Sequence, residues 1–270
     1  MTSPKTNLFA RIRRSALRNR ESAPPDEDES AHRVPDGRRV YAIGDIHGRL
    51  DLLETLHQKI LDDAASNAQA RRRVLIYLGD YVDRGPDSRA VVELLANNPL
   101  PGFDLIHLLG NHEWAMLEFL ENREIAEAWF AYGGYATLVS YGVNPLPRPV
   151  PPEGRIAGLQ NALRAALPAD HFAFLMNLKL SHVEGDYLFV HAGIRPGIPL
   201  ERQEPDDLTQ IRYEFLESNV DHGKVVVHGH TITEEPEIRP NRIGIDTGAF
   251  ASNRLTCLVL DGNRRSFLST

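Results

Sequence analysis

Five short segments of this 270-residue chain end in residues that could bind a metal ion or a phosphate group. Each segment follows an apolar run and combines glycine with aspartate, asparagine or histidine. In sheets of parallel strands, ligands gather at the carboxyl ends of the strands, and glycine lets the backbone turn sharply and approach a ligand. The segments are Gly44-Asp45-Ile46-His47-Gly48, Gly79-Asp80-Tyr81-Val82-Asp83-Arg84-Gly85, Gly110-Asn111-His112-Glu113, His191-Ala192-Gly193 and His228-Gly229-His230.

These residues could supply oxygen and nitrogen ligands for a metal. The chain has eleven histidines and one cysteine, Cys257, so a disulfide within the chain and a cysteine-rich zinc module are excluded. Carboxylate, amide and imidazole ligands suit Mn²⁺, Fe or Zn²⁺. A single Gly-Asp turn or a lone histidine is more often structural than functional. Five such strand ends in one chain are hard to obtain from turns alone.

In the same order, the five segments resemble the signature motifs of the phosphoprotein phosphatase family of calcineurin-like metallophosphatases. They resemble most its small bacterial and phage-type Ser/Thr protein phosphatases. The resemblance covers about residues 38–260, and the segment that begins at Gly79 is its most specific part. It implies a metal-dependent hydrolase with an α/β (α+β) fold, in which a central β-sandwich of two mixed sheets is flanked by helices and carries a mainly helical insertion.

The resemblance also implies that two divalent metal ions share one carboxylate, Asp80. A carboxylate has two oxygens and can bridge the short separation of a two-metal site. Mn²⁺ is the expected metal, with Fe or Zn²⁺ as alternatives, and a hydroxide between the ions would attack phosphorus directly. The implied ligands are Asp45, His47 and Asp80 for the first ion, and Asp80, Asn111, His191 and His230 for the second.

Four residues would act on the phosphoryl group or on its leaving oxygen. The resemblance implies that His112 protonates the leaving oxygen and that Asp83 orients His112 and favours its charged form. Arg84 and Arg212 would hold the phosphoryl oxygens, because a planar guanidinium can donate two hydrogen bonds to them. The segment around Arg212 resembles the second-arginine segment of the family except at Gln210, where a tryptophan is common.

Three functions remain open from the sequence, and activity on phosphotyrosine is open beside the first of them. The favoured one is hydrolysis of phosphoserine or phosphothreonine in a phosphorylated protein or peptide. It is favoured because Asp83 and Glu113 stand where dinucleoside polyphosphate hydrolases of the same superfamily usually have asparagine and aspartate. The alternative is a symmetrical dinucleoside polyphosphate (diadenosine tetraphosphate) hydrolase, which shares the segment Arg84-Gly85-Pro86-Asp87-Ser88. A non-catalytic phosphate-binding module is disfavoured, because every implied metal position is intact.

The elements that must position these residues follow from the apolar pattern. Short apolar runs before Asp45, Asp80 and Asn111 predict buried strands, and the apolar spacing of residues 50–60 and 90–96 predicts helices between them. Strands that alternate with helices predict βαβ units and a largely parallel sheet. Further strands are predicted at residues 187–191, 224–230, 242–246 and 255–260, and the last ones are expected to be antiparallel neighbours because no long crossover separates them.

Charge is distributed unevenly along the chain, whose formal net charge is −7. Residues 1–20 carry six basic and no acidic side chains, so the remainder has a net charge of −13 and should bind nucleic acid poorly. Residues 1–36 are predicted to form a disordered tail, although their basic segment could touch a membrane surface or a partner. Residues 37–270 are predicted to form the metallophosphatase domain, with the helical insertion at 114–180. No apolar run suits a membrane span, and the cysteine content fits the cytoplasm.

Overall fold

The computed structural model describes residues 28–67, 72–97, 100–145 and 152–270. Within these ranges the strands are Asp28–Glu29 (β1), Arg38–Ile43 (β2), Arg72–Tyr77 (β3), Asp104–His107 (β4), Ser181–Glu184 (β5), Tyr187–Val190 (β6), Val225–His228 (β7), Glu237–Ile238 (β8), Arg242–Gly244 (β9), Thr256–Asp261 (β10) and Arg264–Ser269 (β11). The helices are Leu50–Ser66 (α1), Ser88–Ala96 (α2), Asn111–Glu121 (α3), Ala126–Ala131 (α4), Gly134–Ser140 (α5), Pro152–Ala166 (α6), Ala169–Met176 (α7), Pro205–Gln210 (α8), Tyr213–Leu216 (α9) and Ala249–Ser252 (α10).

The strands form two mixed sheets. The first has the order β1-β11-β10-β2-β3-β4, in which β2, β3 and β4 are parallel and β10 is antiparallel to β2. The second has the order β5-β6-β7-β9-β8, in which β6, β7 and β9 are parallel. This architecture confirms the predicted α/β sandwich of two mixed sheets flanked by helices.

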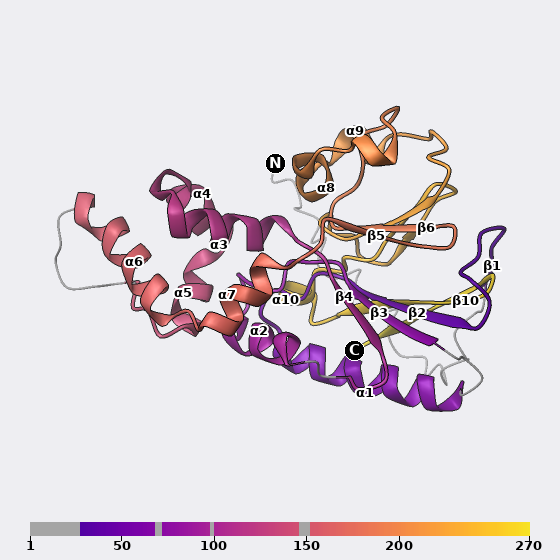
Figure 1. The fold of residues 1–270 in the computed structure, drawn as a ribbon, viewed down its shortest axis with the longest axis horizontal. Coiled ribbons are helices and arrows are strands. Elements are labelled where there is room, and N and C mark those ends of the chain that lie inside the picture. The colour runs from indigo at the N-terminus through magenta and orange to yellow at the C-terminus, as the bar shows by residue number, and fades with distance from the viewer. Residues whose placement is uncertain (1–27, 68–71, 98–99, 146–151) are drawn as a thin grey trace, which may run out of the picture.

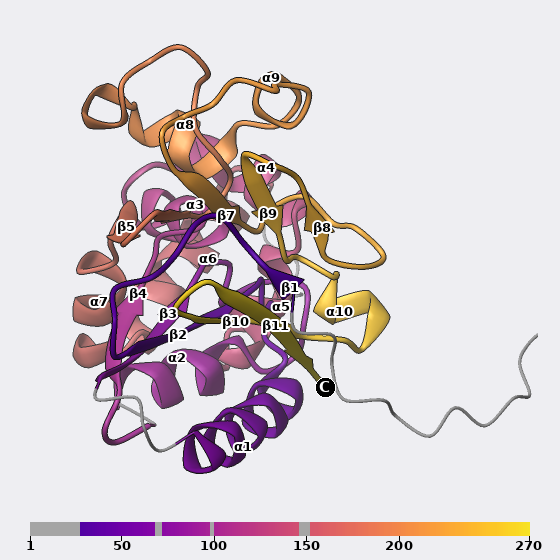
Figure 2. The same ribbon diagram turned by 90° about the vertical axis from the view of Figure 1, so that its right-hand side faces the viewer.

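The two sheets pack face to face because their strands are apolar on both sides. Successive residues of a strand point to opposite faces, so each strand contributes to two layers of core. Between the sheets lie Val40, Ala42, Val74 and Ile76 from the first and Phe189, Val227 and Ile243 from the second. The opposite faces pack on helices: Tyr41, Ile43, Leu75 and Tyr77 contribute to the core that includes α1 and α2, and Leu188, Val190 and Val226 to the one with α8 and α9. Figure 2 shows these four layers, from α8 and α9 at the top to α1 and α2 at the bottom.

Between β4 and β5, helices α3 to α7 project from one end of the sandwich (Figure 1). The turn between α4 and α5 is short, because Gly133 adopts a left-handed conformation with φ of 111° and α5 begins at the next residue. Residues 144–152 are rich in proline, which predicts a loop, and they fall largely outside the described residues. No described helix is long and apolar enough to cross a lipid bilayer.

The prediction that the last strands are antiparallel neighbours is wrong for β7, β9 and β10. Strands β7 and β9 are parallel, and β9 and β10 belong to different sheets. The 13 residues between β7 and β9 are enough for a crossover. Within them the two-residue strand β8 pairs antiparallel with β9, and so short a strand leaves no alternating pattern in the sequence.

The first described residues belong to the sandwich, although the sequence places them in the tail. Strand β1 pairs with β11, the amide of Val34 donates a hydrogen bond to the carbonyl of Gly262, and the Val34 side chain is fully buried between the sheets. The boundary predicted at residue 36 therefore falls inside a packed segment. The basic run of residues 1–20 lies outside the described residues.

Candidate metal and phosphate site

Parallel pairing brings the sequence-predicted site residues to one edge of the sandwich. All of them except Arg212 follow the carboxyl end of a parallel strand, where the next segment turns away from the sheet. All are buried except Asn111 and Arg84, which are half-buried, and Arg212, which is exposed. Asp45 and His47 follow β2; Asp80, Asp83 and Arg84 follow β3; Asn111 and His112 begin α3 after β4; His191 follows β6; His230 follows β7; and Arg212 precedes α9.

The carboxylate of Asp80 lies at the centre of these residues. Its Oδ2 is 3.5 Å from Nε2 of His47 and 3.7 Å from Nε2 of His112, and its Oδ1 is 3.4 Å from Nε2 of His191. Two groups of possible ligands share Asp80, and within each group the ligand atoms lie within 4.8 Å of one another. The groups are His47-Asp80-His112 and Asp80-His191-His230.

Backbone carbonyls fix the orientation of two of the imidazole rings. Nδ1 of His47 lies 2.9 Å from the carbonyl oxygen of Val82, and Nδ1 of His191 lies 3.0 Å from that of Leu78. Because a carbonyl only accepts, each Nδ1 carries the proton and each Nε2 keeps a lone pair directed at Asp80. Burial lowers the pKa of His47 to about 3 and also lowers the pKa of His191. Both rings are therefore neutral near pH 7, the form that binds a metal.

His230 and Asp45 complete the cluster on the side of the second sheet. Nε2 of His230 is buried without a hydrogen-bond partner, and burial and His191 lower the pKa of His230 to about 2. The backbone amide of His230 donates to both carboxylate oxygens of Asp45, at 3.2 and 3.0 Å. Burial, with the carboxylates of Asp246 and Asp80, raises the pKa of Asp45 well above its usual value.

This donor set fits divalent cations. It combines an unpartnered buried imidazole, further imidazoles with free lone pairs and carboxylates that repel one another in a buried position. A bound cation would accept the imidazole lone pairs and offset the repulsion between the carboxylates. Burial alone would raise the pKa of Asp80, but His191, His112 and His47 lower it, so this carboxylate is ionised. Oδ1 of Asn111 lies 3.1 Å from Nε2 of His191, beside the second group of ligands.

His112 is bound to a buried carboxylate rather than to a carbonyl. Its Nδ1 lies 2.7 Å from Oδ2 of Asp83, which also accepts from Nε1 of Trp129 at 2.9 Å. The hydroxyl of Thr137 donates to the other oxygen of Asp83 at 2.6 Å. Burial opposes the charged form of His112, but Asp80 and Asp83 raise its pKa. The arrangement can therefore hold a proton on a ring whose Nε2 faces the cluster.

Two arginines bring positive charge to the same edge. Nη2 of Arg84 lies 3.3 Å from Nε2 of His112, and its guanidinium carbon lies 4.6 Å from the centre of the Phe250 ring. Arg212 lies close enough to contribute to the lowered pKa values of His191 and His230. Arg84 can therefore donate hydrogen bonds to an anion that binds beside Asp80, and Arg212 adds positive charge nearby.

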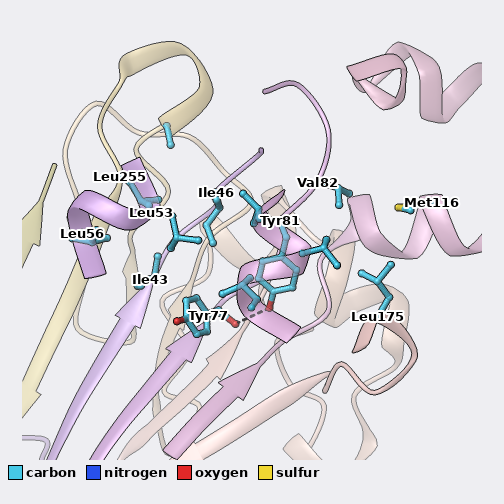
Figure 3. Close-up of a cluster of buried hydrophobic side chains, with 14 of the residues drawn as sticks. Ile43, Ile46, Leu53, Leu56, Tyr77, Tyr81, Val82, Met116, Leu175 and Leu255 are labelled. Carbon is cyan, nitrogen blue, oxygen red and sulfur yellow. Dashed lines mark hydrogen bonds between the residues drawn. The ribbon is translucent and has the colours of Figure 1, made fainter. Parts of the chain in front are cut away.

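The loop that carries Asp80 and Asp83 is fixed by buried anchors (Figure 3). Tyr81 and Val82 enter the core under the helices, where the Tyr81 hydroxyl donates to the carbonyls of Tyr77 and Leu108. The carboxylate of Glu113 accepts from the backbone amides of residues 80, 81, 82 and 110. Glu113 therefore joins the loop after β3 to the start of α3 and faces backbone amides.

Backbone strain concentrates at this edge. Among the described residues, six other than glycine have positive φ, and five of them are site residues: His47, Asp80, Asp83, Arg84 and His230. Such conformations cost energy and cluster at functional sites. Two glycines allow close approach, because a Cβ at Gly110 would overlap the carboxylate of Asp80 and one at Gly229 would overlap that of Asp45.

The sequence did not indicate three residues that contact the site. Burial raises the pKa of Asp246, which shares a hydrogen bond with Asp45, to about 6. The sequence signal for Asp246 is the segment Gly244-Ile245-Asp246, which combines glycine and aspartate at the end of β9. Trp129 and Thr137 give no comparable signal, because they reach Asp83 only through the packing of α4 and α5.

Comparison with known proteins gives a family and named relatives. The sequence profile of the family described as calcineurin-like phosphoesterase matches residues 38–253. The asymmetrical bis(5'-nucleosyl)-tetraphosphatase PrpE of Bacillus thuringiensis (strain Al Hakam) is 28% identical over 236 residues, which are 80% of this chain and 88% of PrpE. PrpE of Bacillus anthracis (strain CDC 684 / NRRL 3495) matches with the same identity and coverage.

Solved structures share the fold. The crystal structure of a protein proposed to be a diadenosine tetraphosphatase has a TM-score of 0.57 and 23% identity, and the match covers 86% of this chain and 92% of that protein. The cold-active protein-tyrosine phosphatase of a psychrophilic Shewanella species has a TM-score of 0.55 and 15% identity, with 87% and 83% covered. At these identities the likeness concerns the fold alone.

The expected activity on phosphoserine and phosphothreonine in proteins is wrong, and so is the expected protein or peptide substrate. Relatives that match most of the chain are named as dinucleoside tetraphosphatases. The structure explains why Asp83 and Glu113 misled. Asp83 lies behind His112, and Glu113 contacts backbone amides. Both side chains are fully buried against other protein groups, so neither is placed to distinguish one substrate from another.

Proposed function

Since this chain belongs to the calcineurin-like phosphoesterase family of metal-dependent hydrolases, we propose that it hydrolyses dinucleoside tetraphosphates such as diadenosine tetraphosphate. The observation that carries the proposal is the 28% identity to relatives of that name over 80% of the chain. Those relatives are named asymmetrical, so we propose asymmetric cleavage to ATP and AMP. This differs from the symmetrical cleavage considered from the sequence, which would yield two molecules of ADP.

We propose that the residues around Asp80 hold two divalent metal ions. Asp45, His47 and Asp80 would bind one ion, and Asp80, Asn111, His191 and His230 the other. Asp246 would support Asp45 through their shared hydrogen bond. When bound, such ions activate water and polarise the phosphoryl group. Mn²⁺ remains the expected metal, and Fe and Zn²⁺ suit the same donors.

The remaining site residues would orient the phosphates and move a proton. Arg84 and Arg212 would donate hydrogen bonds to phosphate oxygens on the side of the cluster that faces solvent. His112 would hold a proton on Nε2 and give it to the leaving phosphate oxygen. Asp83 would fix the ring and stabilise its charged form.

The test is a product analysis with metal-loaded protein. Diadenosine tetraphosphate is incubated with the protein and Mn²⁺, and nucleotides are separated by anion exchange during the first tenth of the reaction. Equal amounts of ATP and AMP are expected. Two equivalents of ADP would contradict the cleavage position but not the substrate class. Faster hydrolysis of a phosphothreonine peptide at equal concentration would overturn the proposal.

We propose that residues 37–270, with the packed segment before them, form the catalytic unit, and that residues 1–27 are dispensable for it. A chain that begins at residue 28 retains β1 and Val34. It should hydrolyse diadenosine tetraphosphate with an unchanged kcat/KM. A chain that begins at residue 37 lacks a buried core residue and should be less stable. If removal of residues 1–27 abolished activity, the tail would belong to the catalytic unit.

A further inference from the structure

An exposed aromatic ring lies beside the candidate site. The ring of Tyr132, at the end of α4, is 6.2 Å from the ring of His112 between centroids, and the residue is 56% exposed. A large apolar ring that remains in water forgoes the stabilisation of burial. Because it borders the residue that would protonate the leaving group, this ring is available to a ligand that occupies the site.

The backbone holds Tyr132 in this place. Its carbonyl accepts from Nε of Arg84 at 3.4 Å, and the carbonyl of Gly133 accepts from the backbone amide of Arg84 at 3.3 Å. A Cβ at Gly133 would come within 2.9 Å of Arg84, so only glycine allows this approach. The guanidinium of Arg84 also packs on the ring of Phe250. The turn between α4 and α5 and the phosphate-binding arginine therefore form one fixed unit.

A second tyrosine, in the first turn of α5, shows a ring that already stacks on another ring of the protein. Tyr135 is 40% exposed, but its ring stacks on Phe130 with centroids 4.4 Å apart and an angle of 20°. Among the described residues, Tyr132 makes one ring contact, with His112 at an interplanar angle of 64°. Tyr135 therefore stacks within the fold, whereas the more exposed Tyr132 ring has no stacked partner among these residues.

We propose that Tyr132 stacks on a nucleobase of the substrate, the base of the nucleotide whose phosphate lies at Arg84 and His112. The inference rests on the proposed function, because a dinucleoside polyphosphate joins planar bases to the phosphates that the site would bind. Base stacking on an aromatic side chain contributes about 1–3 kcal/mol and tolerates any base. Tyr132 would therefore favour nucleotides over phosphates without a base, and it would not select adenine.

The test measures AMP and tripolyphosphate binding to metal-loaded protein by calorimetry, alongside diadenosine tetraphosphate hydrolysis. Tyr132→Ala should weaken AMP binding about 5- to 150-fold and leave tripolyphosphate binding unchanged. Tyr132→Phe keeps the ring and should bind AMP within about threefold of the wild type. The matched control Tyr135→Ala removes an exposed ring three residues further along the chain, in α5, and should leave both affinities unchanged.

The outcomes separate this inference from the proposed function. Wild-type AMP binding no tighter than that of inorganic phosphate would overturn the base contact, whatever the protein hydrolyses. Equal AMP affinity in Tyr132→Ala and the wild type would do the same. Equal losses of AMP and tripolyphosphate binding would assign Tyr132 to phosphate binding and also overturn it. Selective loss of AMP binding in a protein that does not cleave diadenosine tetraphosphate would support the base contact and contradict the proposed function.

Discussion

Two buried histidines in this molecule contact a carboxylate at almost the same distance. Nδ1 of His112 lies 2.7 Å from Asp83, and Nε2 of His171 lies 2.8 Å from Glu93. Glu93 also lines a surface pocket of about 410 Å³ between α2 and α5, and it can group with Asp170 and His171 as possible metal ligands. Distance and a nearby pocket therefore do not distinguish the pair that we assign to proton transfer from the other.

The environment of each pair does distinguish them. The Asp83 side chain is fully buried and accepts from Trp129 and Thr137 as well as from His112. The Glu93 side chain is 53% exposed. In His171 the second ring nitrogen contacts the hydroxyl of Tyr141 at 2.9 Å, so both nitrogens are used by the fold. A histidine can deliver a proton to a substrate only if one nitrogen faces the site, and Nε2 of His112 does so, beside Asp80 and Arg84.

The largest predicted effect follows from removing Nε2 of His112, the ring nitrogen that faces the site. His112→Asn should reduce kcat about 10²- to 10⁴-fold, with the metal content unchanged. The loss should be smaller for a phosphoanhydride than for an alkyl phosphate, because a phosphate leaves more readily without a proton than an alkoxide does. Steady-state kinetics with diadenosine tetraphosphate and with an alkyl phosphate, together with elemental analysis of the protein, measure both points.

The matched variant His171→Asn tests whether the second histidine–carboxylate pair contributes to catalysis. It should leave kcat unchanged and lower the free energy of unfolding by about 1–3 kcal/mol, since it breaks buried hydrogen bonds. Chemical denaturation measures the free energy of unfolding. If His171→Asn lost as much kcat as His112→Asn while remaining folded, the assignment of proton transfer to His112 alone would fail. Loss of metal from His112→Asn would instead make His112 a ligand.

The second effect concerns the carboxylate that holds His112. Asp83→Asn should reduce kcat about 10- to 100-fold, the cost typical of removing a supporting contact to an active residue. Asp83 raises the pKa of His112, so its neutralisation should lower that pKa and move the alkaline limb of the kcat profile to lower pH. A pH–rate series measures the shift. If the alkaline limb stayed at the same pH, a group other than His112 would determine its position.

A smaller effect is expected from removing the hydrogen bond between Thr137 and Asp83. Thr137→Val removes the hydroxyl that donates to Asp83 and accepts from its backbone amide. We expect kcat to fall less than about tenfold, because Trp129 and His112 still hold the carboxylate. Thr137→Ser restores the hydroxyl and should restore kcat. Equal losses in both variants would point to packing rather than to this hydrogen bond.

The sequence predicted the site better than it predicted what supports the site. Asp45, Asp80 and His191 each follow an apolar strand, and parallel pairing brings strand ends together without further information. The partners of Asp83 could not be predicted in this way. Trp129 and Thr137 are 46 and 54 residues away in the chain and reach Asp83 through helices whose packing no local pattern specifies.

The substrate was the least predictable property. The sequence comparison used Asp83 and Glu113, whose side chains face the protein interior. The residue to which we assign base recognition, Tyr132, lies in the helical insertion predicted at residues 114–180, where the sequence assigned no substrate contact to any residue. The positions of site residues at strand ends can be predicted from the fold. The residues that contact the substrate depend on which surface the helical insertion presents.

The smallest effect is predicted for the carboxylate of the second pair. Glu93→Gln keeps an oxygen that can accept from His171, and the side chain is half in water, so the free energy of unfolding should change by less than about 1 kcal/mol. Hydrolysis of diadenosine tetraphosphate and the position of its alkaline limb should both stay as in the wild type. Asp83→Asn, the same chemical change at a similar distance from a histidine, should alter both. An equal change in hydrolysis in the two variants would show that the histidine–carboxylate contact alone determines the effect. A difference between them would show that burial and a ring nitrogen facing the site make such a pair functional.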